Sequence, residues 1–168
     1  MNKRSSVLLL VVLGSTAVAG PIADDYRSGV LGTPWGASLE SVVGVYPVGD
    51  HLFSTAPGQR SYWVKDDQPL FDIPRDELGI LYSFDKENRL LGVSIAFSSE
   101  RIDQLLGALT VRYGAWTRVA PEGVHKYYDW RPDADIQLQV DTTVAGSYGI
   151  TWLAVKCAKC RNGSAPRM

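Results

Sequence analysis

The sequence contains few of the residues that most often carry metal or nucleophilic chemistry. Two histidines and two cysteines occur among its 168 residues. A structural zinc ion takes four protein ligands, and His51 and His125 are isolated in the sequence without ligand spacing. We therefore expect no metal site and no bound cofactor, and we interpret each histidine as a surface or hydrogen-bonded residue.

Motifs for hydrolysis and for phosphate binding are also missing. The chain has no Gly-x-Ser-x-Gly elbow, no His-Glu-x-x-His pair and no glycine-rich phosphate loop. Acidic pairs such as Asp66-Asp67 fall at predicted turns, where solvation accounts for them. The two distant carboxylates of a glycosidase would leave no sequence pattern, so that alternative stays open. Together these absences favour a protein that is not an enzyme.

The chain has no excess of positive charge. It holds 17 Lys and Arg against 18 Asp and Glu, a formal net charge of -1. A protein that follows a phosphate backbone needs a basic stripe or patch, and none is visible here. We expect no nucleic-acid partner.

Long hydrophobic runs are limited to the N-terminus. A basic n-region over residues 1–4 precedes an apolar run over 7–13, and the small residues Ala17-Val18-Ala19 follow. The run is shorter than the about 20 apolar residues of a membrane-spanning helix. We predict a cleavable signal peptide over residues 1–19, a periplasmic or secreted product, and no stable membrane insertion after cleavage.

The rest of the chain is long enough for one core. We predict a flexible lead-in over 20–32, a single α+β domain over 33–157 and a polar C-terminal tail over 158–168. Ser38 is the predicted N-cap of a first helix that Pro47 ends, and Ser99 caps a second helix that Gly114 ends. Apolar residues recur three and four positions apart in both helices, so each has one face to bury.

Six segments rich in aromatic and β-branched residues are predicted strands: 61–65, 80–85, 90–98, 126–131, 136–141 and 148–155. Turn residues such as Asn88 separate them. The order is one helix and then three strands, repeated once. We expect an antiparallel sheet of about six strands with two helices packed on one face, built from a helix-plus-three-strand pseudo-repeat.

Period-two alternation indicates that the other face of this sheet is open. The predicted open face carries Gly92, Ser94, Ala96, Gln137 and Gln139. The segment 148–155 is apolar at most positions, so the sequence does not decide which of its residues point into the core. The adjacent pairs Tyr62-Trp63 and Tyr127-Tyr128 each place one ring outward. Exposed rings often anchor a partner, although core packing is the alternative for each. The candidate partner-binding residues are Tyr62, Trp63, Tyr127, Tyr128, Trp130, Gln137 and Gln139.

Cys157-Ala158-Lys159-Cys160 is the motif with chemical content. The two thiols can close a small disulfide, exchange electrons or supply half of a zinc site. The pair follows a predicted strand, whereas a redox pair normally begins a helix. We favour a structural disulfide between Cys157 and Cys160, formed in an oxidising compartment.

Two segments carry a family resemblance. The helix entry over residues 35–42 and the hairpin over 82–93 resemble those of the β-lactamase-inhibitor-protein superfamily and its outer-membrane-assembly relatives. The resemblance implies a helix-plus-sheet module that holds another protein on an open sheet surface. That family's repeat generally has two helices, whereas each half here has one predicted helix, and no functional residue carries over.

The sequence therefore predicts an exported, non-catalytic protein-binding module of the inhibitor, immunity or envelope-assembly type. Its expected partner is another envelope or secreted protein. Two alternatives stay open at this stage: a thiol-disulfide protein that acts through Cys157 and Cys160, and a cell-wall glycan-binding protein.

Overall fold

The computed structural model describes residues 22–53, 58–66, 68–75, 79–130, 135–145 and 148–160, without the side chains of 51–53, 144, 145 and 148. The predicted signal peptide over 1–19 and residues 161–168 of the predicted tail lie outside this range. The predicted turn residues 132–134 lie outside it as well.

Within the described residues, the main sheet has eight antiparallel strands in the order β3-β4-β5-β6-β10-β9-β8-β7. Their bounds are β3 (Gly49–Phe53), β4 (Arg60–Val64), β5 (Ile80–Phe84), β6 (Leu90–Ser98), β7 (Arg118–Glu122), β8 (His125–Trp130), β9 (Ile136–Ala145) and β10 (Tyr148–Cys157). The α+β class and the antiparallel sheet are confirmed.

The predicted number of strands was wrong, because β3 and β7 were missed. These are the two edge strands, and the repeat is therefore one helix followed by four strands, not three. β3 begins with Gly49-Asp50, and β7 contains Pro121. Such residues are poor strand formers, and proline within a sheet is tolerated at an edge, where one side of the strand needs no hydrogen-bonding partner.

The two halves meet at the centre of the sheet. β6 pairs with β10 antiparallel, and Ile95 lies opposite Leu153 at the middle of their register. Outward from this pair, the strands follow in the order β6, β5, β4, β3 on one side and β10, β9, β8, β7 on the other, so each half has the same arrangement. An approximate two-fold axis perpendicular to the sheet therefore relates the halves. Such a rotation keeps each face of the sheet on its own side, so the helices of both halves lie on the same face.

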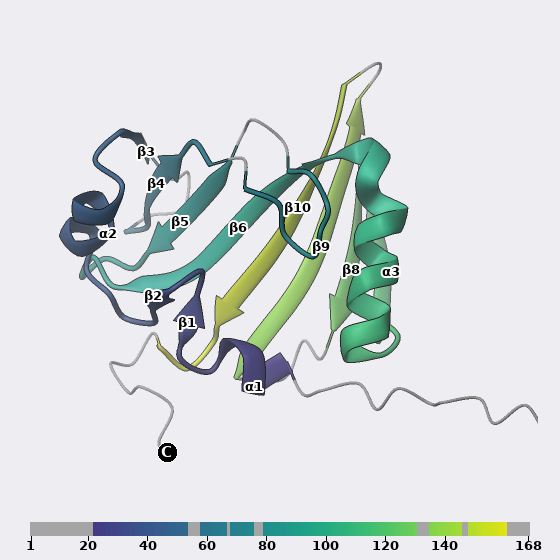
Figure 1. Cartoon of the computed structure of the whole chain (residues 1–168), viewed down its shortest axis with the longest axis horizontal. Coiled ribbons are helices and arrows are strands. Elements are labelled where there is room, and N and C mark those ends of the chain that lie inside the picture. Colours follow the sequence, from purple (N-terminus) through teal and green to yellow (C-terminus); the bar gives the residue numbers. More distant parts are fainter. Residues whose placement is uncertain are drawn as a thin grey trace, which may run out of the picture.

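The helices are α1 (Ile22–Tyr26), α2 (Leu39–Val45) and α3 (Ile102–Tyr113), and they lie on one face of the sheet together with the small hairpin β1 (Gly29–Val30) and β2 (Thr33–Pro34) (Figure 1). Three helices among the described residues replace the two expected. The Ser38 cap is confirmed, since its hydroxyl accepts a hydrogen bond from the Ser41 amide at 3.2 Å. A 3-10 turn over Ser99–Arg101 precedes α3. The N-cap of this turn is Ser98, not the predicted Ser99. Gly114 ends α3 as predicted.

The segment predicted as a flexible lead-in is packed on the sheet over its described part. Ile22 and Val30 are 3% and 2% exposed and belong to the core. Asp25 in α1 accepts hydrogen bonds from Arg112 Nε at 2.7 Å and from the Tyr113 hydroxyl at 2.7 Å. These contacts join α1 to the end of α3, so the packed domain includes α1.

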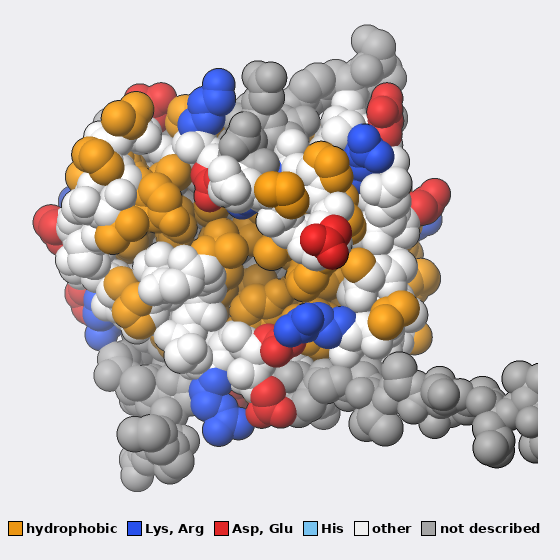
Figure 2. Space-filling view, viewed as in Figure 1, with side chains coloured by type: hydrophobic (Ala, Val, Ile, Leu, Met, Phe, Trp, Pro, Cys, Tyr) orange, Lys and Arg blue, Asp and Glu red, His pale blue; other side chains and the backbone are white. Residues whose placement is uncertain are grey.

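The core lies between the sheet and its helices. Alternate residues of each central strand point into it, including Tyr82 in β5, Val93 in β6 and Leu153 in β10. Thr151 and Thr142 are also buried on this face and hydrogen-bond to each other at 3.0 Å, so their hydroxyls are satisfied. Figure 2 shows this helix-bearing side, where hydrophobic side chains gather in a hollow between α2 and α3.

Candidate functional site

The face of the sheet opposite the helices is the candidate site, and we call it the open face. Its residues are those that alternate with the core residues along β4–β10. All five residues predicted for it (Gly92, Ser94, Ala96, Gln137 and Gln139) lie there, because their sequence neighbours point into the core. The structure also settles β10: Trp152, Ala154 and Lys156 lie on the open face.

The cross-strand register arranges these side chains in rows. One row across the sheet is Trp63, Leu81, Ser94, Ala154, Gln139, Asp129 and Arg118. A second row is Ser61, Ser83, Gly92, Lys156 and Gln137, and a third is Ala96, Trp152, Asp141, Tyr127 and Ala120. Small residues occupy this face along β6 (Gly92, Ser94 and Ala96), and Ala154 of β10 lies beside Ser94, whereas Trp152 and Lys156 of β10 are large.

Two of the predicted aromatic residues lie on the open face. Trp63 in β4 and Tyr127 in β8 are each two strands from the central pair, at positions that the two-fold axis exchanges. Five strand spacings separate their strands, or about 24 Å. Burial and the negative charges of Asp141 and Glu122 raise the pKa of Tyr127, so its hydroxyl stays protonated. Trp152 adds a third ring between them.

Three other aromatic candidates are on the wrong face for a partner. Tyr62, Tyr128 and Trp130 are 1%, 8% and 1% exposed and point toward the helices. Their polar atoms are used internally: the Tyr62 hydroxyl donates to the Tyr46 carbonyl at 2.6 Å, and Trp130 Nε1 donates to the Gly114 carbonyl at 2.8 Å. These three residues are part of the core, so the prediction that they contact a partner was wrong.

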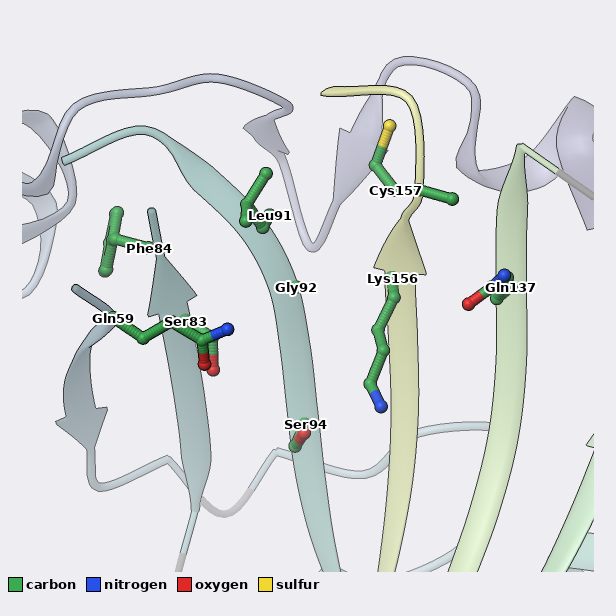
Figure 3. A pocket seen from close by; sticks show the side chains of 10 residues that line it. Gln59, Ser83, Phe84, Leu91, Gly92, Ser94, Gln137, Lys156 and Cys157 are labelled. Carbon is green, nitrogen blue, oxygen red and sulfur yellow. The ribbon is translucent and has the colours of Figure 1, made fainter. Parts of the chain in front are cut away.

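A pocket of about 460 Å³ opens on this face at the end of the sheet near the disulfide (Figure 3). β5, β6, β10 and β9 supply its floor. It is lined by Gln59, Ser83, Phe84, Leu91, Gly92, Ser94, Gln137, Lys156, Cys157 and Ala158. Figure 3 shows the Lys156 side chain extending along β10 toward the level of Ser94. Gly92 lies beside this side chain, since a Cβ on Gly92 would be in van der Waals contact with Lys156 Cγ at 3.5 Å.

Two smaller hollows adjoin this pocket. One, of about 240 Å³, shares Gln59 and Leu91 with it and reaches the β5–β6 turn. The other, of about 160 Å³, shares Gln137 and Lys156 and reaches Arg118 in β7. The three are continuous through these shared residues and run across the strands. We call them together the transverse groove.

The β8 end of the groove holds a neutralised carboxylate. Asp129 is 4% exposed, and it accepts hydrogen bonds from Arg118 Nε at 2.8 Å and from Gln139 Nε2 at 2.8 Å. Its charge is thereby compensated, as a buried carboxylate requires. Gln139, predicted as a partner-binding residue, positions this group.

His125, Thr143 and Asp141 lie together but do not form a catalytic dyad or triad. Thr143 Oγ1 lies 2.8 Å and Asp141 Oδ1 3.3 Å from the same ring nitrogen, Nδ1 of His125. A triad needs the nucleophile on one ring nitrogen and the carboxylate on the other. The ring of His125 also stacks on Tyr127. This cluster is a hydrogen-bonded surface patch, as the sequence led us to expect. His51 lies in β3, and its side chain is outside the described set.

The predicted disulfide is present between Cys157 and Cys160, with 5.4 Å between the Cα atoms. Both residues are buried, at 2% and 5% exposed. The Ala158 amide between them donates to the Asp135 carbonyl at 2.8 Å, which ties the bridge to the start of β9. The ordered domain therefore extends to Cys160, three residues beyond the predicted boundary.

Among the described residues, no group of three or more His, Cys, Asp or Glu side chains is placed to hold a metal ion. The helices in the part of the chain that the structure describes are all too short or too polar to cross a membrane.

Comparison with known proteins adds no relative. No family model matches the chain, and neither a curated protein nor a solved structure does. The resemblance to the β-lactamase-inhibitor-protein superfamily stays an expectation.

Proposed function

We infer that this protein is an exported, non-catalytic binding module that docks another protein on the open face. The observation that carries the proposal is a sheet face that the described helices leave uncovered and that carries three aromatic side chains, Trp63, Trp152 and Tyr127. Trp152 lies on the central strand β10, and Trp63 and Tyr127 lie on β4 and β8 to either side of it. Aromatic residues on a sheet face are common anchors for protein partners.

The area of the open face suits a protein partner. Eight strands at about 4.8 Å spacing give a width of about 34 Å, and six residues along each strand give about 20 Å. The product is about 700 Å², close to the roughly 800 Å² that each partner buries in a standard protein interface. A small ligand would leave most of this face uncovered.

The β7 edge of the sheet is less suited to binding than the open face. β7 carries Pro121, which lacks an amide hydrogen, and charged residues at both ends, Arg118 and Glu122. Proline and charge on an edge strand oppose the addition of a further strand. Docking on the face agrees with this protection of the edge.

The buried disulfide supports a structural role for the cysteine pair. Thiol-disulfide exchange requires attack on an accessible sulfur, and both cysteines are almost fully covered. A disulfide is compatible with a periplasmic or extracellular compartment, where such bonds persist. These points favour the binding module over the thiol-disulfide alternative.

A photo-cross-linking residue at Trp63 or Tyr127, introduced in the cells that produce the protein, tests the proposal. We expect a discrete protein adduct from each open-face position, and several-fold less adduct when Trp152→Ala is added. Val111, an exposed residue of α3, is the matched control and should give no such adduct. Equal adducts from Val111, or none from any position, would contradict the proposal. Quenching of tryptophan fluorescence by peptidoglycan fragments, without a protein adduct, would favour the glycan-binding alternative.

A further inference from the structure

The main pocket of the transverse groove carries one uncompensated positive charge. Lys156 is exposed and makes no ion pair with any described residue. None of the ten lining residues is an Asp or Glu. In the adjoining hollows, Asp129 is paired with Arg118, and Asp85 and Glu87 are both paired with Arg89. The pocket therefore attracts an anion and does not neutralise itself.

The other lining groups fit a carboxylate. Gln59, Ser83, Ser94 and Gln137 add amide and hydroxyl groups to the lining of the same pocket. An ionised carboxylate accepts about four hydrogen bonds, so neutral donors can satisfy the oxygens that do not contact the lysine. Phosphate sites commonly add arginine forks or several backbone amides to a lysine, and no arginine is among the ten residues that line this pocket.

The shape suits a side chain on an extended segment. The pocket volume of about 460 Å³ lies within the range of ligand sites, and the adjoining hollows continue it on both sides across the strands. Leu91 adds an apolar side chain to the lining, and Gly92 forms a floor without a side chain. A chain lying in the groove can lower one acidic side chain onto Lys156.

We propose that the pocket around Lys156 binds a glutamate or aspartate side chain of the docked partner, presented by an extended segment that lies in the transverse groove. The inference rests on the proposed function and names the chemistry of the partner at this site.

The test uses peptides, so it does not depend on finding the partner. An acetylated and amidated pentapeptide, Gly-Ala-Glu-Ala-Gly, and its glutamine counterpart are titrated into the isotope-labelled protein, and amide shifts are followed by NMR. We expect the glutamate peptide to shift the amides of Gly92, Ser94 and Lys156, with about fivefold tighter binding than the glutamine peptide at low salt. Added salt should reduce the difference.

Variants locate the effect. Lys156→Met should remove the preference for glutamate, whereas Lys65→Met, an exposed lysine beyond the other end of β4, should preserve it. Gly92→Val should weaken both peptides, because the new side chain fills the pocket floor. Equal binding of both peptides, shifts confined to other surfaces, or an unchanged preference in Lys156→Met would overturn the inference. At least tenfold tighter binding of a phosphoserine peptide would overturn the carboxylate assignment. Cross-linking at Trp63 would be unaffected by any of these results, so the proposed function is judged separately.

Discussion

The contact between α1 and α3 gives a prediction that can be worked out in detail. Asp25 accepts two hydrogen bonds from the Arg112 guanidinium, at 2.7 and 3.1 Å, and one from the Tyr113 hydroxyl at 2.7 Å. Asp25→Asn removes the negative charge and keeps the shape. The variant therefore tests whether this ion pair holds the N-terminal segment on the sheet.

The expected loss of stability is modest, because the pair is partly exposed. The side chains of Arg112 and Asp25 are 50% and 33% exposed. Exposed pairs contribute 0.2 to about 1 kcal/mol, and the extra hydrogen bond from Tyr113 places this one near the upper end. We expect Asp25→Asn to lower the free energy of unfolding by about 1 kcal/mol at pH 7 and Tm by about 3 to 5 °C.

The pH dependence has a definite sign. The hydrogen bond from Arg112 is the largest cause that lowers the pKa of Asp25 below its usual value, against the opposing effect of burial. A carboxyl with a lowered pKa stabilises the fold fully above its unfolded pKa of about 3.9 and loses this effect as the pH falls through the folded pKa. The difference between wild type and Asp25→Asn should stay constant from pH 7 to about pH 5 and shrink below pH 4.

Urea unfolding at pH 7, 5 and 3, at constant ionic strength, measures these differences. Asp24→Asn is the matched control, because both side chains of the Asp24–Arg27 pair are exposed and the pair should contribute little to stability. The reasoning is refuted if Asp25→Asn is no less stable than the wild type at pH 7. It is also refuted if the deficit is as large at pH 3 as at pH 7.

Three further predictions concern the turn, the sheet and the disulfide. Asn88 has φ of 60°, so Asn88→Ala should cost about 1 kcal/mol in urea unfolding while Asn88→Gly stays near wild type. Leu153→Ala should lower the free energy of unfolding by about 2 to 5 kcal/mol because the Leu153 side chain is fully buried. Trp152→Ala on the open face should lower it much less. Equal losses of stability would mean that the faces of β10 are reversed. Replacing Cys157 and Cys160 together by serine should cost about 2 kcal/mol by calorimetry and leave the fold intact by circular dichroism.

Local patterns in the sequence were sufficient for the elements that have strong signals. The bounds of β6, the cap at Ser38 and the turn at Asn88, with its positive φ, follow from alternation and turn chemistry. The sequence could not predict which residues of β10 point into the core, because residues 150–155 are apolar or weakly polar at every position. A central strand next to a face of small residues shows no clear alternation.

Much of the candidate site depends on contacts between residues that are distant in the chain. Lys156 directly follows the predicted strand 148–155 and was given no role from the sequence, and it lines a pocket because β10 pairs with β6 beside Gly92. Trp152 was similarly assigned to no face. Gln137 was predicted on the open face from alternation alone, and it lines the pocket. The partner contacts proposed for Trp63, Tyr127, Gln137 and Gln139 remain predictions.

The central position of β10 affects how the chain acquires its structure. β10 comes last in the chain among the described strands, yet it lies between β6 and β9 and hydrogen-bonds to both. Until it is available, β6 and β9 each have an unpaired side, and the two halves have no joining strand. The sheet therefore cannot be completed before Tyr148–Cys157 is present, and without this segment β3–β6 and β7–β9 would be two separate pieces, each with an unpaired strand edge.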